Sequence, residues 1–442
     1  MAYGNFEPFI RNLTRAMGAV NTRLQRDLTL RTRVARRFSM TEAGEFLGVD
    51  PAHLTRIGRD ESAFPDGERG GRERTFSPAE IMRIRAVLAS RPGARREVLH
   101  WRKPGDPLHV VTFGAQKGGT GKSLTAAHYA QYLSLFYGLR VGVIDADPQA
   151  TVSLYFASET LPLFDPALGT LSAFMGVDDP GTRALTSRDA KTLNGYWQPT
   201  PWPGIRLLPG GADIQNGDIA LYFLSRGGTP VYRVLRDALA AWDAGCPPVT
   251  RAPDLRRADG GFDDAAFEAA LVETLDVVVI DQQPSLTLMQ LNGLIAADSV
   301  VIPQTMKGFD LATLATYVAN IGEYLEFVAG FEAGLDLGRG GHVVLPTIVQ
   351  EANDRDTEAI VDLWRRAPRD ISQVWYARSD AIANAAEEYK SIYEYTAPKS
   401  RRVSAKAFFD NANAVNDALV QRTLPHLPAR EYAQAFIDAR WG

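Results

Sequence analysis

The stretch HVVTFGAQKGGTGKS, residues 109–123, decides the fold of this chain. Its apolar first part predicts a buried strand, and the apolar periodicity that follows residue 123 predicts a helix. Between them, Gly114 and Gly121-Lys122-Ser123 have the spacing of a phosphate-binding loop. Glycines let backbone N–H groups converge on phosphate oxygens, and the following helix adds the positive end of its dipole. Lys122 supplies a charge to the terminal phosphates, and Ser123 offers a hydroxyl to Mg²⁺.

Two further predicted strands end in carboxylates. Residues 140–147 read RVGVIDAD and residues 275–281 read LDVVVID. Parallel sheets bind ligands at the carboxyl ends of their strands, so we expect these groups beside the phosphate-binding loop. Asp281 would hold the water shell of the metal, and Asp145 or Asp147 would orient an attacking water; the alternative for each is a carboxylate that caps the next turn. The predicted fold class is an α/β P-loop NTPase, with a mostly parallel twisted sheet flanked by helices.

The motifs together resemble a known family. Lys117 begins the run KGGTGKS, and the chain also contains DADPQ (145–149), DQQPS (281–285) and IPQ (302–304). This set is similar to the deviant Walker A motifs of the ParA/MinD family of P-loop ATPases. Over roughly residues 108–425 the chain looks like plasmid-partition ParA proteins with an N-terminal DNA-binding extension, including RepA of repABC-type replicons. Segments 127–133, 204–210, 392–394 and 414–416 add to that resemblance.

The resemblance implies a dimer that encloses two ATP molecules with Mg²⁺. Lys117 would then reach the phosphates of the partner copy, Asp147 would position the lytic water, and Asp145 would lie beside the metal with Ser123 and Asp281. Adenine would be held by the 346–354 segment. The implied nucleotide-binding residues are Gly118, Gly119, Thr120, Gly121, Lys122, Ser123, Leu124 and Asn353.

Two positions depart from the pattern of the family. Gln283 stands where the family usually has the first of two prolines after the Walker B aspartate, which implies a differently shaped loop. Leu124 replaces the common second hydroxyl residue after the P-loop lysine, so one contact to the α-phosphate is in doubt.

The first 105 residues are basic, although the whole chain has a net charge of −4. They hold 20 Lys and Arg against 12 Asp and Glu, which suggests a basic module on an acidic body. Helix-capping signals at Ser39, Asp50 and Ser77 predict three short helices. The first two have helix–turn–helix spacing, and the Gly- and Arg-rich stretch 65–75 predicts a β-wing. The alternative is a small helical packing module. The candidate DNA-binding residues of this winged helix-turn-helix module are His53, Thr55, Arg56, Arg59, Arg72 and Arg74.

A helix with one apolar seam precedes this module. Ile10, Leu13, Met17, Val20 and Leu24 recur at helical spacing and need a partner, either the chain's own domain or a second copy. We therefore divide the chain into an N-terminal dimerisation helix (1–36), the winged module with a basic linker over 91–103 (37–105), the ATPase domain (106–425) and a C-terminal tail (426–442). Residues 224–270 are turn-rich and predict an insertion.

A second basic cluster interrupts the acidic body; it comprises Lys390, Lys399, Arg401, Arg402 and Lys406. Such a cluster is either a solvated face or a surface for non-specific DNA binding, the use that the family makes of this region. Each phosphate that it neutralised would make affinity fall with salt.

Composition and the resemblance lead to one functional expectation. A single cysteine, Cys246, excludes a disulfide within the chain and a multi-cysteine metal site, and no apolar run approaches a membrane span. We expect a cytoplasmic, nucleoid-associated partition ATPase that slowly hydrolyses ATP to ADP and phosphate. A ParB-like protein bound at a centromere would stimulate it, and the N-terminal module would bind an operator for autorepression. The alternatives are a MinD-like membrane-positioning ATPase and an ATP-gated transcription regulator.

Overall fold

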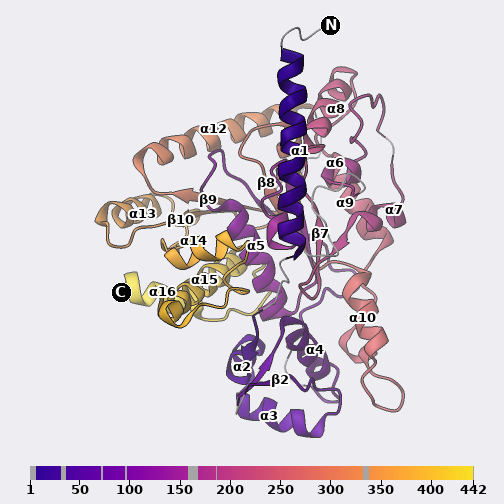
Figure 1. Cartoon of the computed structure of the whole chain (residues 1–442), viewed down its shortest axis with the longest axis vertical. Coiled ribbons are helices and arrows are strands. Elements are labelled where there is room, and N and C mark those ends of the chain that lie inside the picture. Colours follow the sequence, from indigo (N-terminus) through magenta and orange to yellow (C-terminus); the bar gives the residue numbers. More distant parts are fainter. Residues whose placement is uncertain are drawn as a thin grey trace.

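A seven-stranded sheet forms the centre of the chain in the computed structural model, which describes residues 6–30, 36–70, 73–94, 97–157, 168–185, 187–331 and 338–441 (Figure 1). Its order is β10-β9-β4-β8-β5-β7-β6, and all neighbours are parallel except β6 and β7. The strands are β4 (His109–Phe113), β5 (Val141–Ala146), β6 (Gln198–Pro199), β7 (Ile205–Leu208), β8 (Val277–Gln282), β9 (Ser299–Thr305) and β10 (Val343–Thr347). This confirms the predicted α/β fold.

Helices cover both faces of the sheet because its central strands are apolar on both sides. Val277 and Val279 of β8 belong to one core cluster, whereas Val278 and Ile280 belong to the other. On the first face lie α5 (Lys122–Tyr132), the π-helix η1 (Leu133–Tyr137), α13 (Asp354–Arg366), α14 (Asp380–Glu387), α15 (Arg402–Thr423) and α16 (Tyr432–Trp441). The second cluster includes residues of α6 (Leu171–Phe174), α7 (Ala190–Tyr196), α8 (Ile214–Arg226), α9 (Val234–Gly245) and α11 (Leu288–Ala296). The remaining helical elements of the ATPase body are α10 (Asp264–Glu273), α12 (Gly308–Phe331), η2 (Ser153–Tyr155), η3 (Ala252–Leu255) and η4 (Lys399–Arg401).

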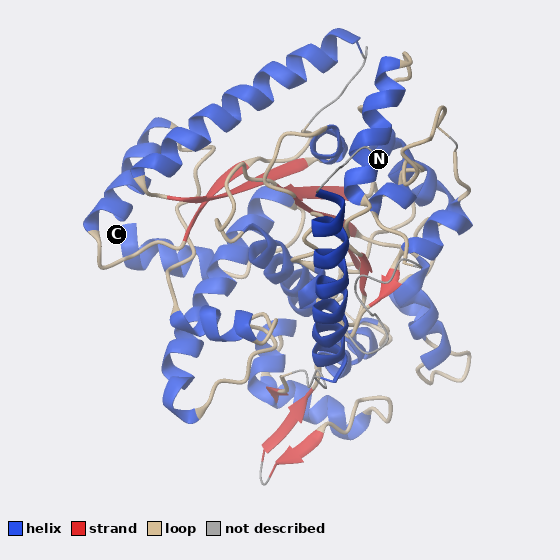
Figure 2. Cartoon of the chain, turned by 45° about the horizontal axis from the view of Figure 1, so that its top comes forward, coloured by secondary structure: helices blue, strands red, loops and turns tan. Residues whose placement is uncertain are grey.

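The segment 36–89 folds as three helices and a small antiparallel sheet, β1-β3-β2 (Figure 2). The predicted caps are present: Ser39 and Ser77 each form a capping box, and Asp50 accepts hydrogen bonds from Ala52 and His53 at the start of a helix with proline at N1. β2 and β3 pair antiparallel within the stretch 65–75, where the sequence predicts a wing. These elements are β1 (Phe38–Ser39), α2 (Met40–Leu47), α3 (Pro51–Asp60), β2 (Glu68–Gly70), β3 (Glu73–Phe76) and α4 (Pro78–Ala89).

The N-terminal helix α1 (Phe6–Leu30) exposes its apolar seam. Ile10, Leu13, Met17 and Val20 are all 41–49% exposed, so described residues of the same chain do not cover them. The side chain of Leu24, the fifth seam residue, lies outside the described part.

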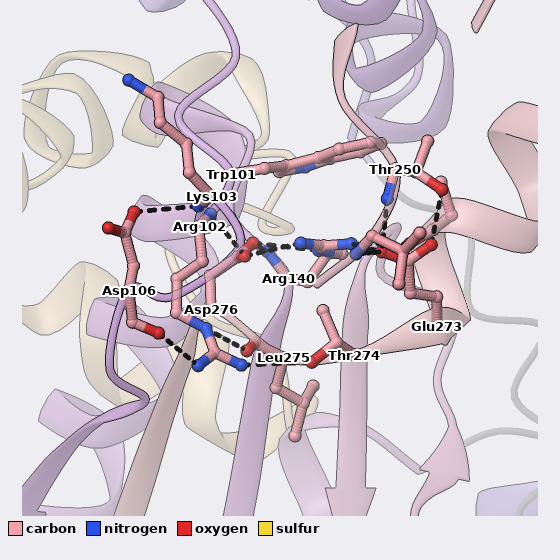
Figure 3. Close-up of polar contacts among 12 residues, drawn as sticks. Trp101, Arg102, Lys103, Asp106, Arg140, Thr250, Glu273, Thr274, Leu275 and Asp276 are labelled. Atoms are coloured by element: carbon pink, nitrogen blue, oxygen red, sulfur yellow. Dashed lines mark hydrogen bonds and ion pairs between the residues drawn. The ribbon is translucent and has the colours of Figure 1, made fainter. Parts of the chain in front are cut away.

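The predicted linker over 91–103 is wrong in its second half, because Val98, Leu99, Trp101 and Arg102 are buried; Figure 3 shows the contacts of Trp101 and Arg102. Trp101 is buried against the guanidinium of Arg140, at 4.5 Å from ring centroid to Cζ. The backbone N–H of Arg102 donates to Asp276 at 2.8 Å, and its guanidinium contacts Asp243 at 2.6 Å. Apolar and ionic contacts together fix this part of the predicted linker to the body. The basic composition of the segment did not indicate these contacts.

A buried arginine joins the module to the P-loop helix. The guanidinium of Arg85 in α4 donates to the carbonyls of Phe46 (3.1 Å), Leu135 (2.7 Å) and Val98. Burial lowers the pKa of Arg85. Because Leu135 belongs to η1, which continues α5, the module contacts the helix that begins at Lys122.

Two other expectations from sequence are corrected. Residues 224–270 are not mainly turns, since they contain α9 and α10, and Leu235, Leu239 and Trp242 of α9 enter the second core. Residues 426–442 are not a free tail: α16 packs on the body, where Phe436 contacts Trp375 at 4.9 Å between ring centroids.

Candidate functional site

Three neighbouring strands bring the sequence motifs to one edge of the sheet. β8 lies between β4 and β5, and Asp281 is paired in register with Phe113 on one side and with Asp145 on the other. Gly114 directly follows Phe113 and begins the phosphate-binding loop. The strand order therefore places the loop and both carboxylates together, as the sequence predicted.

The loop has the backbone that its glycines permit. Gly119 and Gly121 adopt left-handed φ angles of +78° and +81°, and a Cβ at either position would meet open space. Gly114 is needed for another reason, because a Cβ there would lie 2.8 Å from the hydroxyl of Tyr317. The described chain thus leaves free space in front of Gly118, Gly119 and Gly121, at the start of α5.

Lys122 and Asp281 form a buried ion pair under the loop. The ammonium of Lys122 lies 2.6 Å from Asp281 Oδ1 and 3.5 Å from Ser123 Oγ. Burial raises the pKa of Asp281, and the charge of Lys122 opposes that shift. The second oxygen, Asp281 Oδ2, is buried and receives no hydrogen bond from the described atoms. An anionic oxygen left free beside a hydroxyl is an arrangement that suits a hard divalent cation.

Asp145 holds the loop that contains Asp147. Its carboxylate accepts hydrogen bonds from Asp147 N (3.1 Å), Ser153 N (2.9 Å) and Ser153 Oγ (2.6 Å). Burial, followed by the charge of Asp281, raises the pKa of Asp145 to about 7. Ser153 Oγ also accepts from Gly210 N at 3.0 Å, which ties β5 to the loop after β7. These contacts give Asp145 a supporting position, while Asp147 lies nearly buried next to it.

Lys117 is paired with a carboxylate outside the phosphate-binding loop. Its ammonium is paired with the buried carboxylate of Asp310 in the first turn of α12, although half of the lysine side chain is exposed. Thr305 also donates to Asp310. The ion pair, with other hydrogen bonds, lowers the pKa of Asp310 against the effect of burial.

The expected adenine segment starts next to the loop. Thr347 at the end of β10 donates from Oγ1 to the carbonyl of Thr120 at 2.7 Å. Asn353 caps α13, where its side chain accepts from Arg355 N at 3.3 Å. Leu124 packs partly buried against the first core, so this position offers a nucleotide only backbone groups.

The predicted recognition helix presents its polar face. His53, Thr55, Arg56 and Arg59 on α3 are exposed, whereas Leu54 and Ile57 are buried. The expectation that Arg74 contacts DNA is corrected by its contacts within the module. Its guanidinium donates to the carbonyls of Pro65 and Asp66. It also lies over the rings of Phe64 and Phe76, so it stabilises the base of the β2–β3 pair. Arg72 lies outside the described residues.

The C-terminal basic cluster surrounds the start of α15. Lys399, Arg401 and Arg402 are exposed, and Lys406 is exposed but bound to Asp410 at 2.9 Å. Arg402 and Lys406 also line a cavity of about 490 Å³ whose other wall includes Ser39 and Glu42 of the N-terminal module.

Several contributors to the site carry no recognisable signal in the sequence. Asp310 and Thr347 lie far along the chain from their partners, and only the tertiary fold brings them together. Ser153 is close in sequence to Asp145, but no motif marks it. Among the described residues, no group of three or more His, Cys, Asp or Glu side chains could hold a metal ion by itself. A metal at Asp281 would therefore need oxygens from a nucleotide or from water. No helix in the described segments is long and apolar enough to span a bilayer.

These features define a P-loop nucleotide-binding protein. The chain belongs to the CobQ/CobB/MinD/ParA nucleotide binding domain family, whose model matches residues 111–344. The resemblance to the ParA/MinD ATPases expected from the motifs is confirmed.

Three proteins illustrate what this chain is similar to. "Putative replication protein A" of Sinorhizobium fredii (strain NBRC 101917 / NGR234) is 26% identical over 398 residues, covering 88% of this chain and 86% of that protein. Protein SopA of Escherichia coli (strain K12) is 27% identical over 315 residues, covering 68% and 67%. A solved structure named Partition Protein has a TM-score of 0.52 at 18% identity over 92% of this chain and 98% of its own, a likeness of fold.

Proposed function

We propose that this chain is a DNA-partition ATPase whose nucleotide state controls dimerisation and DNA binding. The observation that carries the proposal is the buried pair of Lys122 and Asp281 under an open glycine loop. The family and the partition relatives support the same function. The site would bind ATP and Mg²⁺ and release ADP and phosphate.

The residues present fit a nucleotide with its metal. Amide groups of Gly118 to Ser123 would receive the phosphates, and the free Asp281 Oδ2 with Ser123 Oγ would hold the metal's ligand shell. The cation, when bound, neutralises charge on the phosphate oxygens. Asp147 would orient water for in-line attack, and Asp145 would keep Asp147 in place through the 145–153 hydrogen bonds.

Lys117 would act between two copies. In the single chain its ammonium group is held by Asp310 of α12. Release from Asp310 would let Lys117 reach the phosphates of a second copy and stabilise the charge that develops there. The exposed seam of α1, which its own chain leaves open, supports a second contact between copies that does not depend on nucleotide.

Two surfaces would bind DNA. The exposed residues His53, Thr55, Arg56 and Arg59 of α3 are suited to a groove of an operator. Lys399, Arg401 and Arg402 are suited to backbone phosphates without sequence preference. A ParB-like protein at a centromere would stimulate hydrolysis and release the chain from the nucleoid, and operator binding would give autorepression.

The test is ATP-dependent DNA binding by the purified full-length chain at moderate salt. We expect affinity for non-specific DNA to rise when ATP and Mg²⁺ are present, and expect Lys122→Ala to lose this response. DNA binding that is the same with and without ATP would overturn the proposal.

One alternative has an observation in its favour. The three-helix module with its hairpin fits an ATP-gated transcription regulator, in which hydrolysis is not needed. Turnover measured with DNA and a ParB-like partner separates the two functions. A MinD-like membrane role has less support, because Ala433 and Phe436 of α16 are buried in protein and leave no apolar stripe there for a lipid surface.

A further inference from the structure

A hydrogen-bond network links α8 to the loop that follows Asp281. Asp218 of α8 accepts the backbone N–H of Met289 through Oδ1 at 2.8 Å. Its Oδ2 accepts from the side-chain amide of Gln283, at 3.4 Å from Nε2. All of these donors lie between residues 283 and 289. Asp218 therefore binds both ends of one short loop.

The hydroxyl of Thr287 orients the other members of the network. It accepts a hydrogen bond from Gln283 Nε2 at 2.9 Å and from Gln290 N at 3.3 Å, the second of which caps α11. The side-chain amide of Gln283 thus donates both to Thr287 and to Asp218.

The same loop is connected to the phosphate-binding loop on its other side. Gln290 Nε2 lies 3.2 Å from the hydroxyl of Tyr317 and 3.4 Å from the carbonyl of Gln283. That tyrosine hydroxyl is the group that would meet a Cβ on Gly114. Polar contacts therefore run from Asp218, across the loop after Asp281, to Tyr317, whose hydroxyl lies close to the first glycine of the nucleotide site.

We propose that Asp218 is a positioning residue for nucleotide hydrolysis, which it serves by holding the 283–289 loop through the side chain of Gln283 and the backbone of Met289. This role rests on the proposed function. Only Gln282 separates Asp281 from the loop, so the loop's position decides what faces the terminal phosphate. Nucleotide affinity depends instead on the glycine loop and Lys122, which Asp218 does not contact. Loss of the network should lower kcat and leave binding almost unchanged.

Reversal of the hydrogen bonds gives a sharp test. In Asp218→Asn one acceptor becomes an NH₂ donor that faces the amide donor of Gln283, and in Gln283→Glu two acceptors face each other. The double variant restores one donor and one acceptor between positions 218 and 283. The hydroxyl of Thr287, which accepts from Gln283 in the wild type, would then donate to the carboxylate introduced at position 283. We expect each single variant to lower kcat at least about fivefold with nucleotide Kd changed less than about twofold, and expect the double variant to recover to within about twofold of the wild type.

The control is Asp237→Asn, which makes the same chemical change on α9, where Asp237 is exposed and paired only with Arg233 in the described contacts. Thermal unfolding of each variant checks that it is folded. If Asp218→Asn proves to be unfolded, variants of Thr287 replace it in the test. Thr287→Ser keeps the hydroxyl and should keep kcat, whereas the isosteric Thr287→Val removes the hydroxyl and should lower kcat.

Unchanged kcat in the single variants, or a double variant whose loss equals the product of the two single losses, would overturn the role of Asp218 and leave the proposed function intact. Absence of turnover in the wild-type chain with DNA present would overturn the proposed function, and this role with it.

Discussion

Lys117 is held by Asp310 within its own chain, in an ion pair between a half-exposed ammonium and a buried carboxylate. A lysine proposed to act on a second copy must first leave this carboxylate. Asp310→Asn removes the charge but can still accept from Thr305. Because the ammonium is half-exposed, we take the pair to be worth up to about 1 kcal/mol, and we expect the variant to form the ATP-dependent dimer up to about fivefold more readily for each lysine released.

Sedimentation equilibrium with ATP and Mg²⁺ measures that change. Asp362→Asn, which breaks an exposed pair with Arg366 on α13, is the matched control and should not alter dimerisation. An Asp310→Asn chain that dimerises as the wild type does would show that the pair does not restrain Lys117.

The Lys122–Asp281 pair has two separable effects. Lys122→Ala should abolish nucleotide binding, and it should also destabilise the chain by about 3–5 kcal/mol because it leaves a buried carboxylate uncompensated. Calorimetric titration with ATP and Mg²⁺ measures the first effect, and urea unfolding measures the second.

Adding Asp281→Asn to Lys122→Ala separates these effects. The double variant should regain most of the lost stability but not the binding, since the phosphates still lack their lysine. A Lys122→Ala chain as stable as the wild type would contradict the buried pair.

The C-terminal cluster and α3 should make different contributions to DNA binding. The cluster should determine its salt dependence, and α3 should determine its sequence dependence. Arg401→Ala with Arg402→Ala should weaken binding to any DNA and reduce the slope of log K against log salt by about one to two. Arg56→Ala should weaken operator binding and leave non-specific binding unchanged. Fluorescence anisotropy at several salt concentrations gives both values, and Arg251→Ala, another exposed arginine, serves as control. Equal loss on both DNAs from Arg56→Ala would argue against sequence readout by α3.

The parts of the site predicted from sequence are those in which neighbouring residues carry the chemistry. Strand 109–113, the glycine loop and Lys122 are contiguous, and the carboxylates of Asp145 and Asp281 end apolar strands, so local pattern and the rule for parallel sheets were enough. Helix caps such as Ser39 are local signals too. All of these predictions were confirmed by the fold.

What the sequence could not predict depends on contacts between distant residues. The basic composition of residues 91–103 predicted that Arg102 belongs to a linker. In the structure Arg102 binds Asp276 and Asp243, which lie more than 140 positions away in the sequence. Arg74 has the composition of a DNA-binding wing, yet carbonyls and aromatic rings inside the hairpin hold it. A charged side chain is assigned correctly only when its partners are known.

The seam of α1 should pair copies without nucleotide. Leu13→Asp together with Met17→Asp places two charges on the exposed apolar stripe, and we expect the nucleotide-free dimer to dissociate at least tenfold more readily. Ala19→Asp introduces a charge on the opposite side of the same helix and should have no effect. Light scattering coupled to size exclusion measures both. A wild-type chain that is monomeric without nucleotide would exclude this contact.

Acid should loosen the contact between α5 and the C-terminal part through His128. This ring is fully buried, its Nε2 accepts the backbone N–H of Ile392 at 3.1 Å, and burial lowers its pKa to about 3. The folded chain keeps the ring neutral, whereas the unfolded chain takes up a proton below its ordinary value of 6.5. The stabilisation is therefore complete above pH 6.5 and is lost as the pH falls toward 3. At pH 5 the loss amounts to about 2 kcal/mol.

His128→Gln cannot take up that proton, so the stability advantage of the wild type over this variant in urea unfolding should narrow by about that amount between pH 7.5 and pH 5. His53→Gln on the exposed face of α3 is the control, and its difference from the wild type should stay constant. Parallel pH curves for the wild type and His128→Gln would mean that His128 does not stay neutral in the folded chain.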